Sequence, residues 1–194
     1  MKTASLPTPT VELVQAECDA FDQEPSTRLG EEALGLLWAQ YPHNTEPSHV
    51  LLKVLVLNKL YSTQIRDIDV EPLSRHITGI GIDSLLTQGS LEAVDLITNC
   101  PDLKKYLSFA SKFCSWHKPT VYPIWDGNAR ACLWAYQKQP DRFASFHNYD
   151  LWVYDSFRAT IIAFRDYYGL ASLTFKELDK FLWRLGDRIL LGED

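Results

Sequence analysis

Apolar residues recur every three to four positions through most of this chain, and no segment of any length alternates as a β-strand does. The most apolar segment, residues 48–65, reads SHVLLKVLVLNKLYSTQI. Val50, Leu57 and Tyr61 fall on one face of a helix, which we expect Ser48 to cap. The residues that widen this face are Leu51, Leu55 and Leu60. A helix that is apolar on most sides is surrounded by others, so we expect an all-α fold with this helix at its centre.

Helical patterns cover most of the remaining sequence. Thr174 and Glu177 have the spacing of a capping box, and Pro119 ends the helical pattern that precedes it. The other predicted helices span residues 11–21, 31–41, 69–79, 90–98, 102–117, 126–136 and 151–168, and the last begins at Thr174. Residues 121–125 are expected to be extended.

The length of 194 residues suits one domain. We expect residues 1–46 to be an acidic segment with short helices that packs on a single helical domain, residues 47–192. No apolar run reaches the roughly 18 residues that span a bilayer, and residues 1–10 lack the apolar stretch of a signal peptide. These features predict a cytoplasmic protein that does not insert into membranes.

Four cysteines lie far apart in the sequence, without a Cys-x-x-Cys pair and without a histidine at a metal-ligand spacing. We interpret them as buried free thiols and expect no metal site. They are Cys18, Cys100, Cys114 and Cys132.

Charge is distributed unevenly along the chain. Residues 1–46 hold eight acids and two bases and alone account for the net charge of -6. Residues 103–149 carry seven bases against two acids, Asp126 and Asp141. The bases are Lys104, Lys105, Lys112, Lys118, Arg130, Lys138 and Arg142. Such a stretch either forms a solvated basic surface or contacts the phosphates of a nucleic acid.

Asp126 follows an apolar Tyr-Pro-Ile-Trp run and precedes a predicted helix. A carboxylate at this position usually caps the helix by accepting backbone N–H bonds, which stabilises it by roughly 1 kcal/mol. A carboxylate held on rigid structure among cationic groups can instead stabilise a cationic transition state. From the residues alone, both interpretations stay open.

The segment Tyr122–Leu133, YPIWDGNARACL, resembles the region of helix-hairpin-helix DNA glycosylases in which a Pro-(Ile/Val)-x-Asp precedes the helix with the catalytic aspartate. It is most similar to the adenine-glycosylase form, with its Asp-Gly-Asn. The segments SFASKF and YPIWD are also similar to a group of uncharacterised bacterial proteins with a reduced version of this pattern. The resemblance covers residues 48–190 approximately. It implies a helical bundle like the two-lobed barrel of these enzymes, with Asp126 as the catalytic carboxylate.

Two features of the glycosylase family are altered in this sequence. The Leu-Pro-Gly-x-Gly hairpin, whose amides bind a DNA phosphate, is replaced by Tyr106-Leu-Ser-Phe-Ala. The lysine nucleophile of bifunctional members normally lies about 18 residues before the aspartate, where this chain has Ser108; the nearest lysine is Lys112. Lys112 is therefore either a phosphate-binding or surface lysine or, alternatively, a Schiff-base nucleophile. No cysteine cluster follows, so we expect neither an iron–sulfur centre nor another cofactor.

The resemblance also implies a DNA-binding surface and a base pocket. The expected DNA contacts are Ser108, Ser111, Lys118, Asn128, Arg130, Lys104 and Lys105. The expected pocket residues are Tyr61, Gln64, Trp116, His117 and Trp125. Each has an ordinary alternative: Tyr61 and Gln64 as polar residues at a helix end, the tryptophans as core, and His117 as a cap of the last carbonyls of its helix rather than a partner of Asp126 or of a base.

These features predict a DNA glycosylase-like protein that extrudes a base from double-stranded DNA and cleaves its N-glycosidic bond. One alternative is a non-catalytic nucleic-acid- or protein-binding module of the same fold, which the lost glycine hairpin favours. Another is a protein-interaction module that uses the acidic N-terminal segment.

Overall fold

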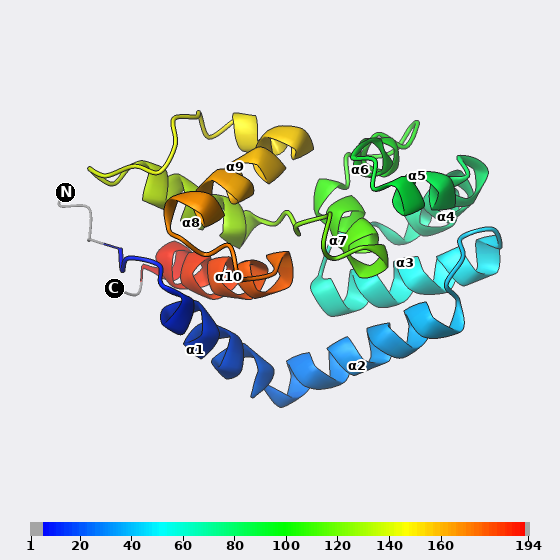
Figure 1. Ribbon diagram of the computed structural model, residues 1–194. Coiled ribbons are helices and arrows are strands. Elements are labelled where there is room, and N and C mark those ends of the chain that lie inside the picture. Colours follow the sequence, from blue (N-terminus) through cyan, green and yellow to red (C-terminus); the bar gives the residue numbers. More distant parts are fainter. Residues whose placement is uncertain (1–5, 193–194) are drawn as a thin grey trace. The chain divides into compact units, whose positions relative to one another are not determined.

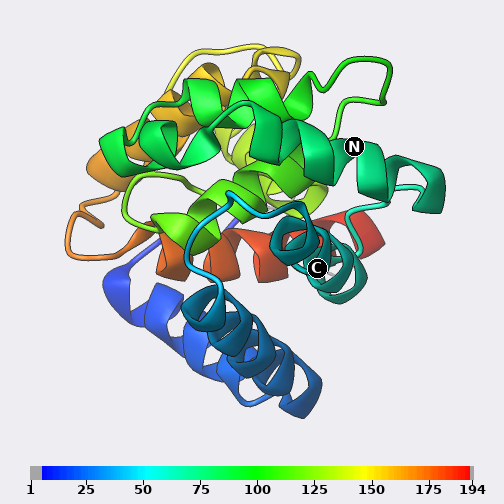
Figure 2. The ribbon, with the colours of Figure 1, turned by 90° about the vertical axis from the view of Figure 1, so that its right-hand side faces the viewer.

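The computed structural model describes residues 6–192, and in that range it contains ten α-helices, one short 3₁₀ helix and no strand. Figure 1 shows these helices and the loops that join them, and Figure 2 shows the same elements turned by 90°. The prediction of an all-α protein is confirmed. None of the helices in the described range is long and apolar enough to cross a membrane.

The chain forms two compact units. The terminal unit combines Met1–Glu24 with Pro123–Asp194, and the central unit is Pro25–Tyr122. The boundary therefore falls after Glu24 and again inside the Tyr122–Leu133 segment. The expected division was into residues 1–46 and residues 47–192. The boundaries of the two compact units do not coincide with it, and the division itself stays a prediction.

The terminal unit contains α1 (Val11–Asp22), α8 (Gly127–Gln137), the 3₁₀ helix η1 (Asp150–Trp152), α9 (Tyr154–Tyr167) and α10 (Phe175–Leu191). Helix α10 packs against both α8 and α1, and α9 packs against η1 and α8 (Figure 1). Helices α8 and α10 approach closely at Gly186 of α10, where an added Cβ would lie only 2.1 Å from the carbonyl oxygen of Asn128 in α8. A glycine is required there because no side chain fits between the two helices.

The central unit contains α2 (Pro25–Gln40), α3 (Pro47–Tyr61), α4 (Asp67–Gly79), α5 (Ile82–Gln88), α6 (Glu92–Thr98) and α7 (Leu107–His117). Helix α3 contacts α2, α4 and α7, while α6 packs on α7. Its core is formed by side chains such as Val54, Leu57, Leu73, Phe109 and Phe113, all fully buried.

Two details predicted for α3 are wrong. The helix begins one residue before Ser48, with Pro47 at its first position and Glu46 as an N-cap that makes no side-chain bond. Proline suits a first helical position because its fixed φ is already helical and the missing N–H has no partner there. The helix is also covered on fewer sides than expected, since Leu55 and Leu60 are each 45% exposed.

Several helix boundaries also differ from the prediction. Helix α2 begins at Pro25, six residues before the predicted start, and α5 was not predicted. The helix expected from residue 102 starts at Leu107, because Asp102 has φ +63 and lies in a turn that interrupts the helical pattern. Pro72, expected near the start of α4, lies inside it. These starts depend on turn geometry that hydrophobic spacing does not report.

Other local predictions are confirmed. Thr174 and Glu177 form a capping box at the start of α10. Asp126 is the N-cap of α8. Of residues 121–125, which were expected to be extended, Val121 lies in a turn and the others are neither helix nor strand. The four cysteines are free and buried.

Candidate functional site

Asp126 joins residues 122–125, which are neither helix nor strand, to α8. Its backbone is extended, with φ -151 and ψ 175, and its Oδ1 accepts a hydrogen bond of 2.8 Å from the backbone N–H of Ala129. The segment before it is anchored by two hydrogen bonds: Tyr154 Oη donates to the carbonyl of Pro123 at 2.8 Å, and Trp125 Nε1 donates to the carbonyl of Leu151 at 2.6 Å. The carboxylate is thus held firmly and is only partly exposed.

Arg130 lies one turn after Asp126 on the same helix, so the two residues share a face of α8. Its Nη1 donates to Asn148 Oδ1 at 2.8 Å, and its guanidinium carbon lies 5.2 Å from the centre of the Trp152 ring. Trp125, directly before Asp126, also packs on Trp152, with ring centres 4.8 Å apart. Trp152 therefore contacts residues on both sides of Asp126 in the sequence.

Asn128 and Trp125, both predicted site residues, have structural roles in this unit. Asn128 Nδ2 donates to Asp187 Oδ1 at 3.3 Å, which ties the first turn of α8 to α10. Trp125 is buried, with only 6% of its surface exposed, and its indole N–H is used by Leu151. Trp125 therefore fits the interpretation as a core residue better than the interpretation as a residue that lines a pocket.

Lys112 belongs to the central unit, on α7. It is 4% exposed, its Nζ donates to Ser108 Oγ at 2.9 Å, and it lies 5.6 Å from the centre of the Tyr61 ring. Tyr61 donates in turn to Glu31 Oε1 at 2.7 Å, and Ser111 Oγ donates to the carbonyl of Ser108 at 3.1 Å. The structure thus brings together four predicted residues from two helices and adds Glu31, which the sequence analysis missed.

The remaining basic residues of the central unit are dispersed. Lys104 and Lys105 are exposed just before α7, and Lys118 Nζ donates to the carbonyl of Thr87 at 2.7 Å. The stretch of residues 103–149 is divided between the units, with Lys104, Lys105, Lys112 and Lys118 in the central one. The positive net charge of residues 103–149 is therefore shared between two compact units and does not belong to either one alone.

His117 makes a contact that the sequence analysis did not predict. Its Nε2 lies 3.2 Å from Asn44 Nδ2, and its ring packs against Trp38 and Phe113. Burial, together with the nearby charge of Lys53, lowers the pKa of His117 to about 3. The imidazole is therefore neutral and forms part of an interior polar cluster of the central unit.

The two other pocket predictions lie near the ends of α3 and α7. Gln64 is exposed, has φ +62, and donates through Nε2 to the carbonyl of Ser62 at 3.1 Å. Trp116 is half-buried and packs on Trp38 with ring centres 5.8 Å apart. Gln64 is thus an exposed polar residue just after the end of a helix, as its ordinary alternative predicted.

A cavity of about 740 Å³ lies elsewhere in the terminal unit, between residues 6–11 and the pair Tyr167 and Tyr168. Tyr136 lines it and donates to the carbonyl of Pro7 at 2.7 Å. None of the predicted site residues lines this cavity. In the described range, no group of three or more His, Cys, Asp or Glu side chains is arranged to hold a metal ion.

Comparison with known proteins places the chain in a family. A family model described as HI_0787_N, N-terminal domain, matches residues 13–121. The chain belongs to this family. The matched region runs from α1 through α7, so it includes Lys112 and ends five residues before Asp126.

A protein of Haemophilus influenzae, described as "Uncharacterized protein", is 33% identical over 181 residues, which is 91% of this chain and 84% of that protein. No solved structure matches the chain. Neither description names an activity, so the function is argued from the residues of this chain.

Proposed function

We propose that this protein is a DNA glycosylase-like enzyme, with Asp126 as the carboxylate that assists cleavage of an N-glycosidic bond. The proposal includes a resemblance of its helical fold to the two-lobed barrel of helix-hairpin-helix glycosylases. The all-helical composition and the presence of two compact units support that resemblance.

The observation that carries the proposal is the setting of Asp126. It follows an extended segment that side-chain hydrogen bonds hold in place, it starts a helix, and Arg130 lies one turn away. The Ala129 N–H donates to Oδ1 and orients the carboxylate. Because the carboxylate is fixed before the substrate arrives, it need not reorganise as charge develops.

The chemistry assigned to this carboxylate is hydrolysis by a single aspartate. As the bond between C1′ and the base breaks, positive charge develops on the sugar, and the Asp126 carboxylate stabilises it electrostatically. Water then forms the new bond to C1′ and gives its proton to solvent, while the departing base takes a proton from solvent. Selectivity would come from the low cost of extruding a damaged or mismatched base.

Lys112 has two possible roles in this scheme. It is a phosphate contact, or its neutral amine attacks C1′ and expels the base, which takes a proton from solvent; the C1′–O4′ bond then breaks, O4′ is protonated, and an imine joins Lys112 to C1′. Borohydride reduces such an imine to a stable covalent link between protein and DNA. A trapped complex that is lost in Lys112→Met would identify Lys112 as the nucleophile, and cleavage without a trapped complex would leave water as the nucleophile.

The deciding experiment measures strand cleavage after alkali on duplexes that carry a panel of damaged or mismatched bases. Wild type is compared with Asp126→Asn, a variant that retains an N-cap side chain. We expect product with at least one substrate from the wild type and none from the variant. If no duplex gives product, although the wild type binds DNA, the glycosylase proposal is wrong.

A non-catalytic module is the second candidate, and one observation favours it: the Asp126 carboxylate already caps α8 through Ala129. The N-terminus of α7 stands where the glycine hairpin is expected. Its N-cap is Tyr106, which makes no side-chain hydrogen bond, and the glycines that bind a DNA phosphate in the glycosylases are missing there. DNA binding measured over a range of salt concentrations tests this candidate. A steep loss of affinity with salt supports a nucleic-acid-binding module, and no binding at low salt supports a protein-interaction module.

A further inference from the structure

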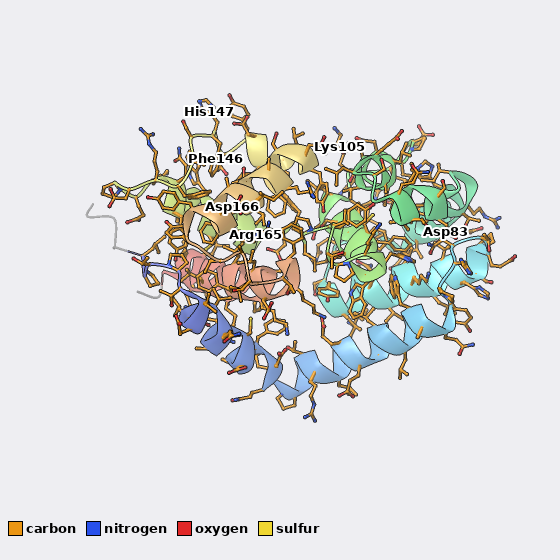
Figure 3. All side chains as sticks on the ribbon, in the orientation of Figure 1. Asp83, Lys105, Phe146, His147, Arg165 and Asp166 are labelled. Carbon is orange, nitrogen blue, oxygen red and sulfur yellow. The ribbon has the colours of Figure 1, made fainter. Side chains whose placement is uncertain are left out.

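Four aromatic side chains of the terminal unit lie on or beside the segment that connects α8 to α9, with cationic groups between them. We call them the aromatic band: Trp134, Phe146, Tyr149 and Trp152. Tyr149 and Trp152 are 68% and 56% exposed, respectively. Figure 3 labels Phe146 and His147 on this segment and shows the His147 side chain extending away from the ribbon. Single exposed rings are ordinary, but rings that gather in one exposed patch mark an interaction surface.

The backbone places the two most exposed rings on the same side. Tyr149 and Trp152 are three residues apart at the 3₁₀ helix η1, and side chains three apart eclipse each other in a 3₁₀ helix. The turn is held by the Asp150 carboxylate, whose Oδ2 accepts from the backbone N–H of His147 at 2.8 Å. The His147 ring stacks on Tyr149, with centres 5.0 Å apart and planes 11° apart. Because Tyr149 remains largely exposed with one face covered by His147, its other face is open to a ligand.

Cationic side chains accompany the rings along the band. Arg130 lies over Trp152 at 5.2 Å, and Lys138 Nζ lies 4.8 Å from the centre of Trp134, whose ring packs on Phe146 at 6.1 Å. From Asp126 to Trp152 the chain has three bases and three acids, so the cations beside the rings are identified by their contacts and not by the charge of the sequence.

The band is connected directly to the proposed catalytic carboxylate. Trp152 packs on Trp125, the residue before Asp126, and on Arg130, one turn after it. A polymer that lies along the band is therefore led toward the start of α8.

From these contacts we propose that the aromatic band binds an unpaired, single-stranded stretch of DNA by stacking bases on Tyr149 and Trp152. Arg130 and Lys138 contact its phosphates. Exposed aromatic rings interleaved with cations are the arrangement by which proteins hold single strands without reading their sequence. The inference rests on the proposed function only in taking DNA as the polymer, and stacking on the band requires no chemistry at Asp126.

The test is binding of the full-length protein to a short single-stranded oligonucleotide containing 2-aminopurine, whose fluorescence falls when the base stacks. Tyr149→Ala and Trp152→Ala are each expected to weaken binding by about five- to a hundredfold, from the usual contribution of one stacked base. Tyr149→Phe and Trp152→Phe keep a ring and are expected to bind within a few-fold of wild type. Tyr167→Ala removes a ring of the same unit outside the band, 52% exposed, and is the matched control.

Alanine variants that bind as tightly as wild type, or a wild type that binds no oligonucleotide, would overturn the inference. The outcome is separable from that of the glycosylase proposal. If the alanine variants lose binding but no duplex is cleaved by the wild type, the band stands and the glycosylase proposal falls. If the wild type cleaves a duplex and the alanine variants bind normally, the glycosylase proposal stands and the inference about the aromatic band falls.

Discussion

The side-chain oxygen of Asn44 accepts a hydrogen bond of 2.8 Å from the ammonium group of Lys53, which is fully buried in the central unit. Because an ammonium group only donates, this bond fixes the orientation of the Asn44 amide. Its Nδ2 must then face Asp83 Oδ1 at 2.5 Å and His117 Nε2 at 3.2 Å. His117 therefore accepts through Nε2 and carries its proton on Nδ1. One asparagine connects a buried cation, a carboxylate and a neutral imidazole.

Removal of the Asn44 side chain should destabilise the protein. Asn44→Ala leaves the buried Lys53 ammonium without this acceptor, and a hydrogen bond to a charged group contributes roughly 1.5–3 kcal/mol. The free energy of unfolding in urea should fall by about that amount. Gln15→Ala, at an exposed amide side chain on α1, is the control and should change it by less than about 0.5 kcal/mol. Equal effects of the two substitutions would contradict the assignment.

His117 predicts a specific loss of stability in mild acid. Burial, with the charge of Lys53, lowers its pKa to about 3 in the folded protein, against about 6.5 when unfolded. Below pH 6.5 the unfolded state binds a proton that the folded state does not, so this stability is complete above pH 6.5 and is lost as the pH falls toward 3. The slope is at most about 1.4 kcal/mol per pH unit.

His117→Gln, which does not titrate, isolates this contribution. Unfolding free energies of both proteins should be compared between pH 6.5 and 4.5, above the range in which most carboxylates are protonated. The wild type should lose about 2–3 kcal/mol more than the variant over this interval. Parallel pH profiles would show that His117 titrates normally in the folded protein.

Gly186 should tolerate no larger residue. In Gly186→Ala, the new Cβ would lie 2.1 Å from the Asn128 carbonyl oxygen, so α10 and the first turn of α8 must separate. Overpacking of this kind costs about 1–3 kcal/mol, and more where backbone is involved. Gly35→Ala is a matched helical control with nothing within 4 Å of the added Cβ, and it should stabilise the protein by about 0.5–1 kcal/mol. Opposite shifts of the thermal midpoint are the expected result.

Substitutions at Asp126 can separate capping from chemistry. Asp126→Ala removes the acceptor of the Ala129 N–H and should cost about 1 kcal/mol of unfolding free energy. Asp126→Asn keeps an acceptor and should lie within about 0.5 kcal/mol of wild type, because asparagine and aspartate are similar N-caps. Loss of cleavage in Asp126→Asn at unchanged stability would then report chemistry. A strongly destabilised Asp126→Asn would show that the charge itself holds α8.

Much of the local structure could be predicted from the sequence. The Thr174–Glu177 capping box and the Asp126 N-cap are interactions between residues three apart, so their residue types indicate them directly. Helix starts that depend on turn conformation were missed, as at Leu107, because the positive φ of Asp102 leaves no hydrophobic pattern.

The candidate site was less accessible to this reasoning. The lone Lys53 within an apolar run was the one available sign of an interior polar cluster, but its partners Asn44 and His117 lie 9 and 64 positions away. Trp152 gave no sign at all, since a tryptophan in a loop can be exposed or buried with equal ease. Its contacts with Trp125 and Arg130 require the chain to return over α8.

The sequence by itself determined the helical class, most helix positions, the caps at Asp126 and Thr174 and the buried free thiols, because these depend on spacing and residue type within a few positions. Only the tertiary structure decided that Tyr122–Leu133 crosses a boundary between two compact units, that His117 is paired with Asn44, and that an aromatic band adjoins Asp126. These features arise from packing between segments far apart in the chain. Their energies depend on distance and orientation that no local pattern encodes.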